Sequence, residues 1–251
     1  MEWMDHAIRK HADLKDRFPI IHTGFLELDS MAPLLRRGTV SLLGSRPGMG
    51  RSTLAAQIAA NIADAGGYVV WFTTVLSVGE IVEKILRVKP DFQCPQNIAL
   101  EDRVGDGREL QQAVMELEQQ IDLVVVDDLQ GMYRISRGGQ AIFDAARICA
   151  DLRDFARSQN MAVLLLSRLT RASEYRRGHH PISVDIPHWE SIKRVVDSVF
   201  LLHRDGYYTG DTSQYQVATI AAGPSIDRCA VLSLLWDKMT GRFLPYDARL
   251  L

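Results

Sequence analysis

Hydrophobic residues along this chain occur either in short continuous runs or at helical spacing, and the two patterns alternate. Continuous apolar runs predict buried strands at 39–45, 68–74, 121–129, 161–167, 196–204, 214–222 and 230–237, with an edge piece at 241–246. Apolar residues at helical spacing predict helices at 2–15, 52–65, 78–88, 108–120 and 141–158. Proline, glycine or polar residues dominate the remaining segments, and we expect irregular structure at 89–108, 134–140 and 168–190.

This order of elements predicts the α/β fold class. Strands that alternate with helices form βαβ units, so we expect a mostly parallel, twisted sheet flanked by helices. The last three long predicted strands follow one another without helices, which indicates antiparallel strands at the C-terminal edge. We expect residues 1–19 to be a linker or arm helix that docks elsewhere, and 20–251 to form one domain.

A glycine-rich loop connects the first long predicted strand to an alanine-rich helix. Gly48 and Gly50 allow backbone N–H groups to surround an anion, and the N-terminus of the helix adds a positive dipole. This context is typical of a phosphate-binding loop. The candidate residues for binding ATP or ADP are Ser45, Arg46, Pro47, Gly48, Met49, Gly50, Arg51, Ser52 and Thr53. The alternative is a glycine turn without a ligand, and Ser45 and Arg51 depart from the usual glycine and lysine.

An acidic strand end supplies the second part of such a site. Four apolar residues at 123–126 precede Asp127, which would hold Mg²⁺ through a water molecule. The hydroxyl of Ser52 is placed to ligate the same Mg²⁺. Taken alone, Asp127 is more simply explained as an ordinary aspartate at a strand end. The two motifs together predict Mg²⁺-dependent nucleotide binding.

Composition sets limits on location and partners. The 251 residues include 29 Lys+Arg and 31 Asp+Glu, a net charge of −2, which excludes a polybasic tail but not a local basic face. The three cysteines form no CxxC pair, so neither a disulfide framework nor a zinc ribbon is expected. No apolar run reaches the ~18–20 residues of a membrane-spanning helix, and the charged N-terminus is unlike a signal peptide. We expect a cytoplasmic protein that makes no contact with a membrane.

Five segments of the chain have an order and spacing that point to one family. They are TGFLELDSM (23–31), RRGTVSLLGSRPGMGRS (36–52), VVVDDLQGM (124–132), LLLSRLTRASEYR (164–176) and VFLLHRDGYY (199–208). Together they resemble the ATPase domain of DnaB-type replicative DNA helicases, over roughly residues 20–246. The resemblance implies a RecA-like P-loop NTPase core and a homo-oligomeric, hexameric ring. It also implies nucleotide at subunit interfaces and single-stranded DNA in the central channel.

The same resemblance marks positions where catalytic residues differ. The family's catalytic glutamate lies in a Ser-Leu-Glu-Met block, and the matching block at 73–76 places Val75 there. Glu80 would serve instead only in a different register. Arg168 stands where the family has a glutamine that senses the γ-phosphate, and Arg51 where it has the loop lysine. On this resemblance, we expect these replacements to remove the water-activating base and to change the phosphate contacts.

A fourth difference lies near the C-terminus. The family's Lys-x-Arg fingers precede a Gly-Pro-Thr-Gly turn, but residues 221–225 read AAGPS, and Arg228 is nearby but displaced. Water positioning and electrostatic stabilisation each contribute orders of magnitude to phosphoryl transfer. We therefore expect a degenerate member in which nucleotide binding persists and hydrolysis is weak or lost.

The segment at 168–204 departs from the balanced charge of the chain. It contains seven basic and four acidic residues, a local charge of +3, interleaved with aromatic and histidine side chains. Basic and aromatic groups together suit a phosphate backbone with stacked bases, and the resemblance implies a DNA-contacting loop here. The DNA-binding candidates are Arg171, Arg176, Arg177, Lys193 and Arg194. A solvated loop is the alternative; a metal at His179 and His180 lacks an evident third ligand.

Three functions remain open from the sequence. The first is a DnaB-like helicase domain that binds ATP or ADP, Mg²⁺ and single-stranded DNA in DNA replication. The second is a non-catalytic RecA-fold protein that binds a replicative helicase or its loader. The third is a recombinase-like or clock-like ATPase, against which the Asp-x-Leu-Gln pattern at 127–130 argues.

Overall fold

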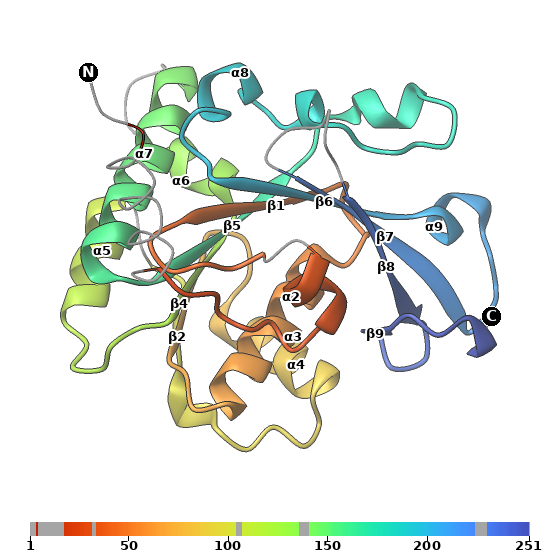
Figure 1. The fold of residues 1–251 in the computed structure, drawn as a ribbon, viewed down its shortest axis with the longest axis horizontal. Helices are drawn as coiled ribbons and strands as arrows, with labels where there is room; N and C mark the ends of the chain where they lie inside the picture. The colour runs from red at the N-terminus through yellow and green to blue at the C-terminus, as the bar shows by residue number, and fades with distance from the viewer. Residues whose placement is uncertain are drawn as a thin grey trace.

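A nine-stranded sheet runs through the computed structural model, which describes residues 4, 18–31, 34–103, 107–135, 141–223 and 230–250. The strand order is β3-β2-β4-β5-β1-β6-β7-β8-β9 (Figure 1). The strands are β1 (Val40–Ser45), β2 (Val69–Thr73), β3 (Ile98–Glu101), β4 (Leu123–Asp127), β5 (Ala162–Arg168), β6 (Ser198–Arg204), β7 (Tyr215–Gly223), β8 (Ala230–Asp237) and β9 (Arg242–Pro245).

Strand pairing divides the sheet into a parallel part and an antiparallel edge. The order from β3 to β6 is parallel throughout, with β1 between β5 and β6. The pairs β6–β7, β7–β8 and β8–β9 are antiparallel. Antiparallel neighbours need only short connections, whereas parallel neighbours need crossovers, usually helices. The predicted α/β class and the antiparallel C-terminal edge are both confirmed.

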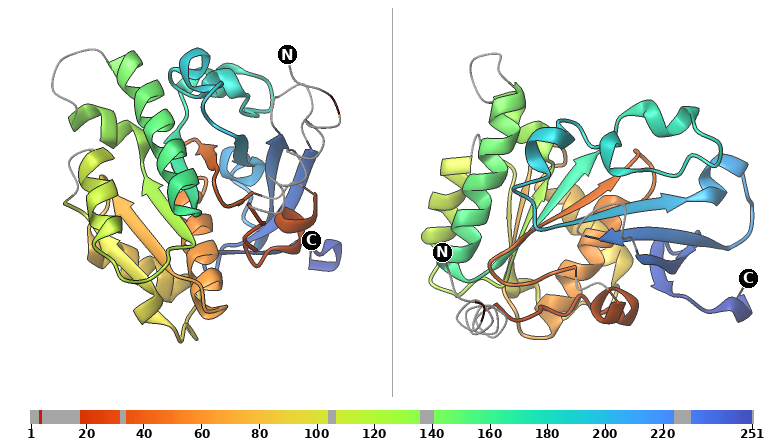
Figure 2. Two further views of the ribbon diagram at one scale, coloured as in Figure 1. Left: turned by 60° about the vertical axis from the view of Figure 1, so that its left-hand side comes forward. Right: turned by 45° about the horizontal axis from the view of Figure 1, so that its top comes forward.

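Helices cover both faces of the parallel part (Figure 2). They are α2 (Leu26–Met31), α3 (Arg51–Asp64), α4 (Val78–Val88), α5 (Gly107–Met115), α6 (Leu129–Ile135), α7 (Ala141–Gln159), α8 (Trp189–Ile192) and α9 (Asp205–Thr209). Short 3₁₀ turns lie at Pro95–Asn97, Arg171–Tyr175, Ser183–Asp185 and Ala248–Leu250. Buried residues of α2, α3 and α4 share one hydrophobic core, and those of α5, α6, α7 and α8 share the other.

The helix α3 is the element that the glycine loop leads into. Nine of its residues are buried, many of them alanines that allow close approach to the sheet. The buried side chain of Gln57 donates to the carbonyl of Phe243 and accepts from its N–H, at 2.9 and 2.7 Å. These bonds tie α3 to the edge strand β9, so the antiparallel edge also supports the middle of the helix.

Several expected boundaries differ in the structure. Strand β3 lies inside the segment expected to be irregular, because pairing with β2 specifies it while its four residues are only half-buried. Helix α5 ends at Met115, five residues before the predicted end at Gln120. Helix α6 follows β4 directly, where the sequence pattern indicated no helix. The short elements α2, α8 and α9 were also unpredicted, since four to six residues are too few for a recognisable helical period.

Some predictions fall outside the described residues. Of the expected arm at 1–19, only Met4, Phe18 and Pro19 are described, so the arm stays a prediction. The same holds for 136–140 and for residues 224–229, which include the last two residues of the finger block and Arg228. In the part of the chain that the structure describes, no helix has the length and apolar character needed to cross a membrane.

Candidate functional site

The carboxyl ends of the parallel strands bring the predicted site residues to one edge of the sheet. Ser45 at the end of β1 pairs with Arg168 at the end of β5. Thr73 at the end of β2 pairs with Asp127 at the end of β4. This edge is where open α/β sheets bind ligands, because loops and helix N-termini converge there.

The glycine loop between β1 and α3 has a backbone that requires its glycines. Gly48 and Gly50 have φ angles of +83° and +96°, which side chains rarely adopt. A Cβ atom on Gly48 would lie 2.8 Å from the ring of Tyr207, and one on Gly50 would lie 2.9 Å from Phe243. The loop is therefore held close to the antiparallel edge, and both glycines are needed for that packing.

A cavity of about 300 Å³ opens against this loop, a volume at the lower end for small-molecule sites. It is lined by Ser45, Arg46, Pro47, Gly48, Gly50, Arg51, Ser52, Thr53, Lys84, Arg168 and Trp236. Eight of the nine loop candidates line it, and the exception is Met49, which is buried in the hydrophobic core. Lys84 on α4 and Trp236 on β8 had no motif to mark them, and only the fold brings them to the cavity.

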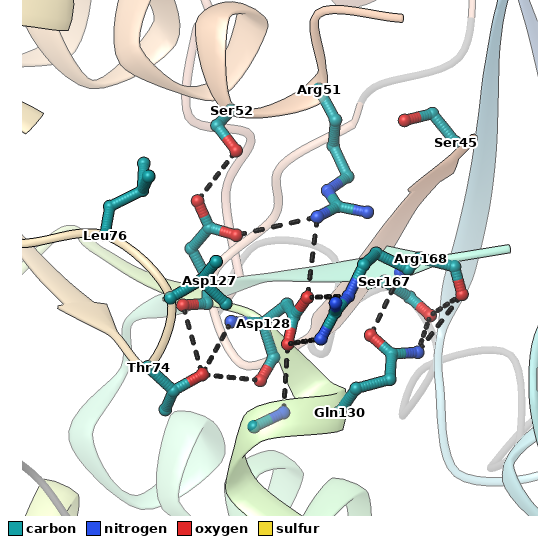
Figure 3. A network of polar contacts seen from close by, with 12 residues as sticks. Ser45, Arg51, Ser52, Thr74, Leu76, Asp127, Asp128, Gln130, Ser167 and Arg168 are labelled. Carbon is teal, nitrogen blue, oxygen red and sulfur yellow. Dashed lines mark hydrogen bonds and ion pairs between the residues drawn. The ribbon is translucent and has the colours of Figure 1, made fainter. Parts of the chain in front are cut away.

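The two predicted Mg²⁺ ligands lie side by side. The hydroxyl of Ser52 donates to Oδ2 of Asp127 at 2.7 Å (Figure 3). Asp127 is 2% exposed, and burial raises the pKa of its carboxyl, against the opposing effects of Arg51 and Ser52. A hydroxyl and a carboxylate that converge at a loop of this kind are ligands that Mg²⁺ takes.

Arg51 points toward the acidic strand end (Figure 3). Its Nη2 atom lies 3.7 Å from Oδ1 of Asp127 and 3.6 Å from Oδ2 of Asp128. The Nε atom of Arg51 is buried and has no hydrogen-bond partner among the described residues. Burial lowers the pKa of the guanidinium, although the two carboxylates oppose that shift.

Asp128 is the residue that the sequence analysis missed. Its side chain is fully buried, and Oδ2 lies 2.7 Å from Nε of Arg168 and near Arg51 as well. Oδ1 accepts a hydrogen bond from the backbone N–H of Gly131 at 2.9 Å. Two arginines and two aspartates thus form a charge-balanced group, which we call the Arg51–Arg168 cluster: Arg51, Asp127, Asp128 and Arg168. The adjacent aspartates were the only available signal in the sequence.

Gln130 positions Arg168 from the other side. Its amide nitrogen donates to Oγ of Ser167 at 2.8 Å, and its amide oxygen accepts from the backbone N–H of Arg168 at 3.0 Å. The side chain of Gln130 is buried on α6. The Asp-x-Leu-Gln pattern therefore links the ends of β4 and β5, which are neighbours in the sheet.

The turn after β2 carries Val75, the position that the resemblance was expected to match to the family's catalytic glutamate. Val75 is half-exposed, and its backbone N–H donates to Oγ1 of Thr73 at 3.2 Å. Glu80 accepts from the backbone N–H and hydroxyl of Ser77, both at 2.8 Å, in a capping box that begins α4. The carboxylate of Glu80 is therefore engaged at the start of its own helix.

Arg46 and Arg204 hold the glycine loop to its surroundings. Arg46 contacts Glu174 through Nη2 at 2.6 Å and donates from Nη1 to the carbonyl of Leu169 at 2.7 Å. Arg204 donates to the carbonyl of Gly48 at 2.5 Å, and its guanidinium lies 4.3 Å from the ring centre of Trp236. The side chain of Arg46, the second residue of the loop, therefore already has partners within this chain.

The DNA-binding candidates lie in different environments. Arg176 forms a two-pronged ion pair with the fully buried Asp185, at 2.7 and 2.5 Å, and this contact raises the pKa of Arg176. Lys193 pairs with Glu190 at 2.5 Å. The remaining candidates Arg171, Arg177 and Arg194 are exposed. The pair of Arg176 and Asp185 thus organises part of this segment, and DNA contact by the segment stays a prediction.

Comparison with known families gives one match to a family model. The model of the DnaB-like helicase C terminal domain matches residues 20–102 and 94–243. A protein of Chlamydia psittaci described as a probable plasmid replicative DNA helicase is 24% identical over 272 aligned positions, which cover 95% of this chain and 58% of that protein. The replicative DNA helicase DnaB of Geobacillus stearothermophilus is 27% identical over 80% of this chain.

The chain therefore spans about half the length of these curated relatives, 58% and 50%. Solved structures agree on the fold. A DnaB-like replicative helicase, solved to describe its interactions with primase, superimposes with a TM-score of 0.82 over 98% of this chain and 68% of that one, at 20% identity. A second solved structure, of an ATPase domain by itself, gives 0.80 over 98% of this chain and the whole of that chain, also at 20% identity.

Proposed function

Because this chain belongs to the family of DnaB-like helicase C-terminal domains, we propose that it binds ATP or ADP with Mg²⁺ at the glycine loop and hydrolyses ATP weakly or not at all. The observation that carries the proposal is the convergence of loop, Ser52 and Asp127 beside one cavity at the carboxyl edge of the sheet. Loops of this type bind phosphate through backbone N–H groups and the helix dipole.

The residues present fit a Mg²⁺-nucleotide. Ser52 and Asp127 would hold the ion, and the guanidinium of Arg51, whose buried Nε has no hydrogen-bond partner among the described residues, offers a donor beside the cavity. Lys84 and Arg168 add positive charge to its lining. When bound, Mg²⁺ would neutralise charge on the phosphate oxygens. The planar guanidinium of Arg51 holds an anion differently from the point charge of a lysine.

Loss of hydrolysis rests on two features of the described residues. Val75 cannot accept a proton from water, and Glu80 is engaged at the start of α4. Asp128 holds Arg168 by a contact of 2.7 Å, so the residue at the γ-phosphate-sensing position is paired with a carboxylate. Activation of the attacking water and sensing of the γ-phosphate would therefore lack the side chains that usually perform them.

The test is a calorimetric titration of ATP–Mg²⁺ and ADP–Mg²⁺ into the chain and into the Arg51→Lys variant. We expect binding in both, and a turnover number well below ~1 s⁻¹ with and without single-stranded DNA. Ser52→Ala is expected to lose the Mg²⁺ dependence. The matched control is Ser158→Ala, an exposed serine near the end of α7, at the opposite edge of the sheet.

Two results would contradict the proposal. If neither the chain nor Arg51→Lys binds nucleotide, the assignment of a nucleotide site to the glycine loop is wrong. If turnover reaches ordinary enzyme rates, hydrolysis is retained, and some group other than Val75 or Glu80 activates water.

Ring assembly and single-stranded DNA binding in DNA replication are part of the same proposal. The family membership supports a homo-oligomer, and the exposed basic residues of 171–194 support contact with a phosphate backbone. The second candidate, a non-catalytic partner of a replicative helicase or its loader, is favoured by the Arg51–Arg168 cluster, which is charge-balanced without nucleotide. Co-elution with a purified replicative helicase distinguishes it.

A further inference from the structure

A second group of ligand-type side chains lies outside the glycine loop. His203 near the end of β6, Asp205 at the start of α9 and His180 after the 3₁₀ turn at Arg171–Tyr175 present one nitrogen or oxygen each, all within 4.8 Å of one another. It is the one group of three or more metal-ligating side chains among the described residues. The sequence offered His180 without a third ligand, because His203 and Asp205 follow more than 20 residues later.

The distances within this group are close to those of a metal site. Nε2 of His203 lies 2.8 Å from Oδ1 of Asp205, and Nε2 of His180 lies 3.8 Å from the same oxygen. Zinc ligands at 2.0–2.2 Å in tetrahedral geometry stand about 3.3 Å apart. Small movements would therefore bring the three atoms around one ion.

The three side chains differ in how far they are buried. The side chain of His203 is 3% exposed and fixed in the sheet, whereas those of His180 and Asp205 are 58% and 60% exposed. The two exposed side chains are free to adjust around an ion held by the buried one. Two imidazoles and one carboxylate are a ligand set that zinc takes in sites that keep a fourth position for water.

A hydrogen bond between His203 and Asp205 alone would explain only part of this arrangement. It would leave unexplained why a second imidazole, His180, lies against the ring of His203, with centroids 4.5 Å apart, and directs Nε2 to the same carboxylate oxygen. The neighbouring His179 is engaged elsewhere: its Nδ1 contacts the carbonyl of Glu174 at 3.0 Å, and its ring stacks on Tyr208.

We propose that His180, His203 and Asp205 form a binding site for a divalent cation of the zinc class, with water as the fourth ligand. The ion would join the segment after Arg171–Tyr175 to the junction of β6 and α9. Arg204, between two of the ligands, donates to the carbonyl of Gly48. The site therefore lies next to a contact of the glycine loop, although the proposal does not depend on nucleotide binding.

The test uses Co²⁺ as a spectroscopic probe for the zinc site. The tag-free chain is treated with a chelator, and Co²⁺ is titrated without nucleotide while the visible absorption of four-coordinate cobalt is followed. We expect one equivalent to bind and Zn²⁺ to displace it. Loss of one ligand in His180→Ala or Asp205→Asn is expected to weaken binding at least about tenfold, since even outer-shell changes cost that much.

The matched control is His22→Ala, which removes an exposed histidine from another part of the chain. Circular dichroism establishes that each variant is folded, which is expected because both altered ligands are exposed. Absence of a cobalt band overturns the proposal. Equal affinity of the unchanged chain and His180→Ala also overturns it, because the ion would then be bound by other residues.

Discussion

The buried side chain of Asp128 changes how the arginines at positions 51 and 168 are interpreted. Arg51 and Arg168 each replace a residue expected in the family, and separately each indicates a lost catalytic part. In the structure both contact the same carboxylate, which is fully buried. A buried ion pair that loses one partner leaves an uncompensated charge. The two arginines and Asp128 therefore depend on one another.

Asp128→Asn is the variant that tests this dependence. We expect the free energy of unfolding to fall by about 3–5 kcal/mol, because the guanidiniums of Arg51 and Arg168 lose a shared counter-charge. We also expect nucleotide to bind more tightly, since both guanidiniums become available to phosphate. Urea denaturation and calorimetric titration measure the two effects. The exposed Asp91→Asn is the control, and unchanged stability of Asp128→Asn would show that the cluster contributes nothing.

Cys149 gives a prediction about a single thiol. It is fully buried on α7, and burial raises its pKa to about 12. Because the thiolate is the reactive form, Cys149 is expected to resist alkylation in the folded protein, whereas the half-buried Cys94 reacts faster than Cys149. Mass spectrometry after brief iodoacetamide treatment, with and without urea, measures this difference. If Cys149 is alkylated as fast without urea as with it, α7 opens readily in the folded protein.

Helix α6 and the turn after β2 are positioned against each other by a glycine. A Cβ atom on Gly131 would lie 1.7 Å from Oγ1 of Thr74. That hydroxyl also accepts from the backbone N–H of Asp128 at 3.3 Å. Glycine is unfavourable inside a helix, so its presence in α6 reflects this close approach. The contact fixes the turn that carries Val75.

Two glycine-to-alanine variants distinguish packing from helix propensity. Gly131→Ala is expected to lower the free energy of unfolding by about 1–3 kcal/mol, because Thr74 must move. Gly79→Ala, in α4 with open space around it, is expected to raise stability by up to about 1 kcal/mol. Denaturant titrations of both variants measure the contrast. If Gly131→Ala is as stable as the unchanged chain, the turn has room to shift.

Across the protein, the basic segment and the glycine loop are parts of one connected surface. Arg46 of the loop contacts Glu174, 128 residues later, and Arg204 contacts the loop carbonyl of Gly48. The exposed basic residues Arg171 and Arg177 lie on either side of Glu174 in the sequence. A ligand on the basic segment would therefore be linked mechanically to the glycine loop.

Binding of single-stranded DNA is expected to depend on these exposed arginines. The double variant Arg171→Ala and Arg177→Ala should weaken binding and reduce the slope of log affinity against log salt by about 0.7 for each lost phosphate contact. Fluorescence anisotropy with a labelled oligonucleotide at several salt concentrations measures the slope. Arg249→Ala, an exposed arginine at the C-terminal end, is the control. An unchanged slope in the double variant would place any DNA contact elsewhere.

Local patterns in the sequence were enough to predict the strands other than β3, the helices α3, α4, α5 and α7, and the glycine loop. Continuous apolar runs and helical periods arise within ten or twenty residues, so they need no knowledge of how the sheet is ordered. The loop at 44–53 and Asp127 were predicted on the same basis, and their meeting through Ser52 is what parallel strand ends bring about. The family resemblance likewise rested on contiguous segments.

Tertiary structure alone decided which charged and polar residues meet. Asp128 between Arg51 and Arg168, Arg176 on Asp185, and His180 beside His203 all depend on strand order or on loop closure. Strand β3 was missed for the same reason, since an edge strand of four half-buried residues is specified by its neighbour β2. Burial and pairing of a charge are properties of three-dimensional neighbours, and no local period records them.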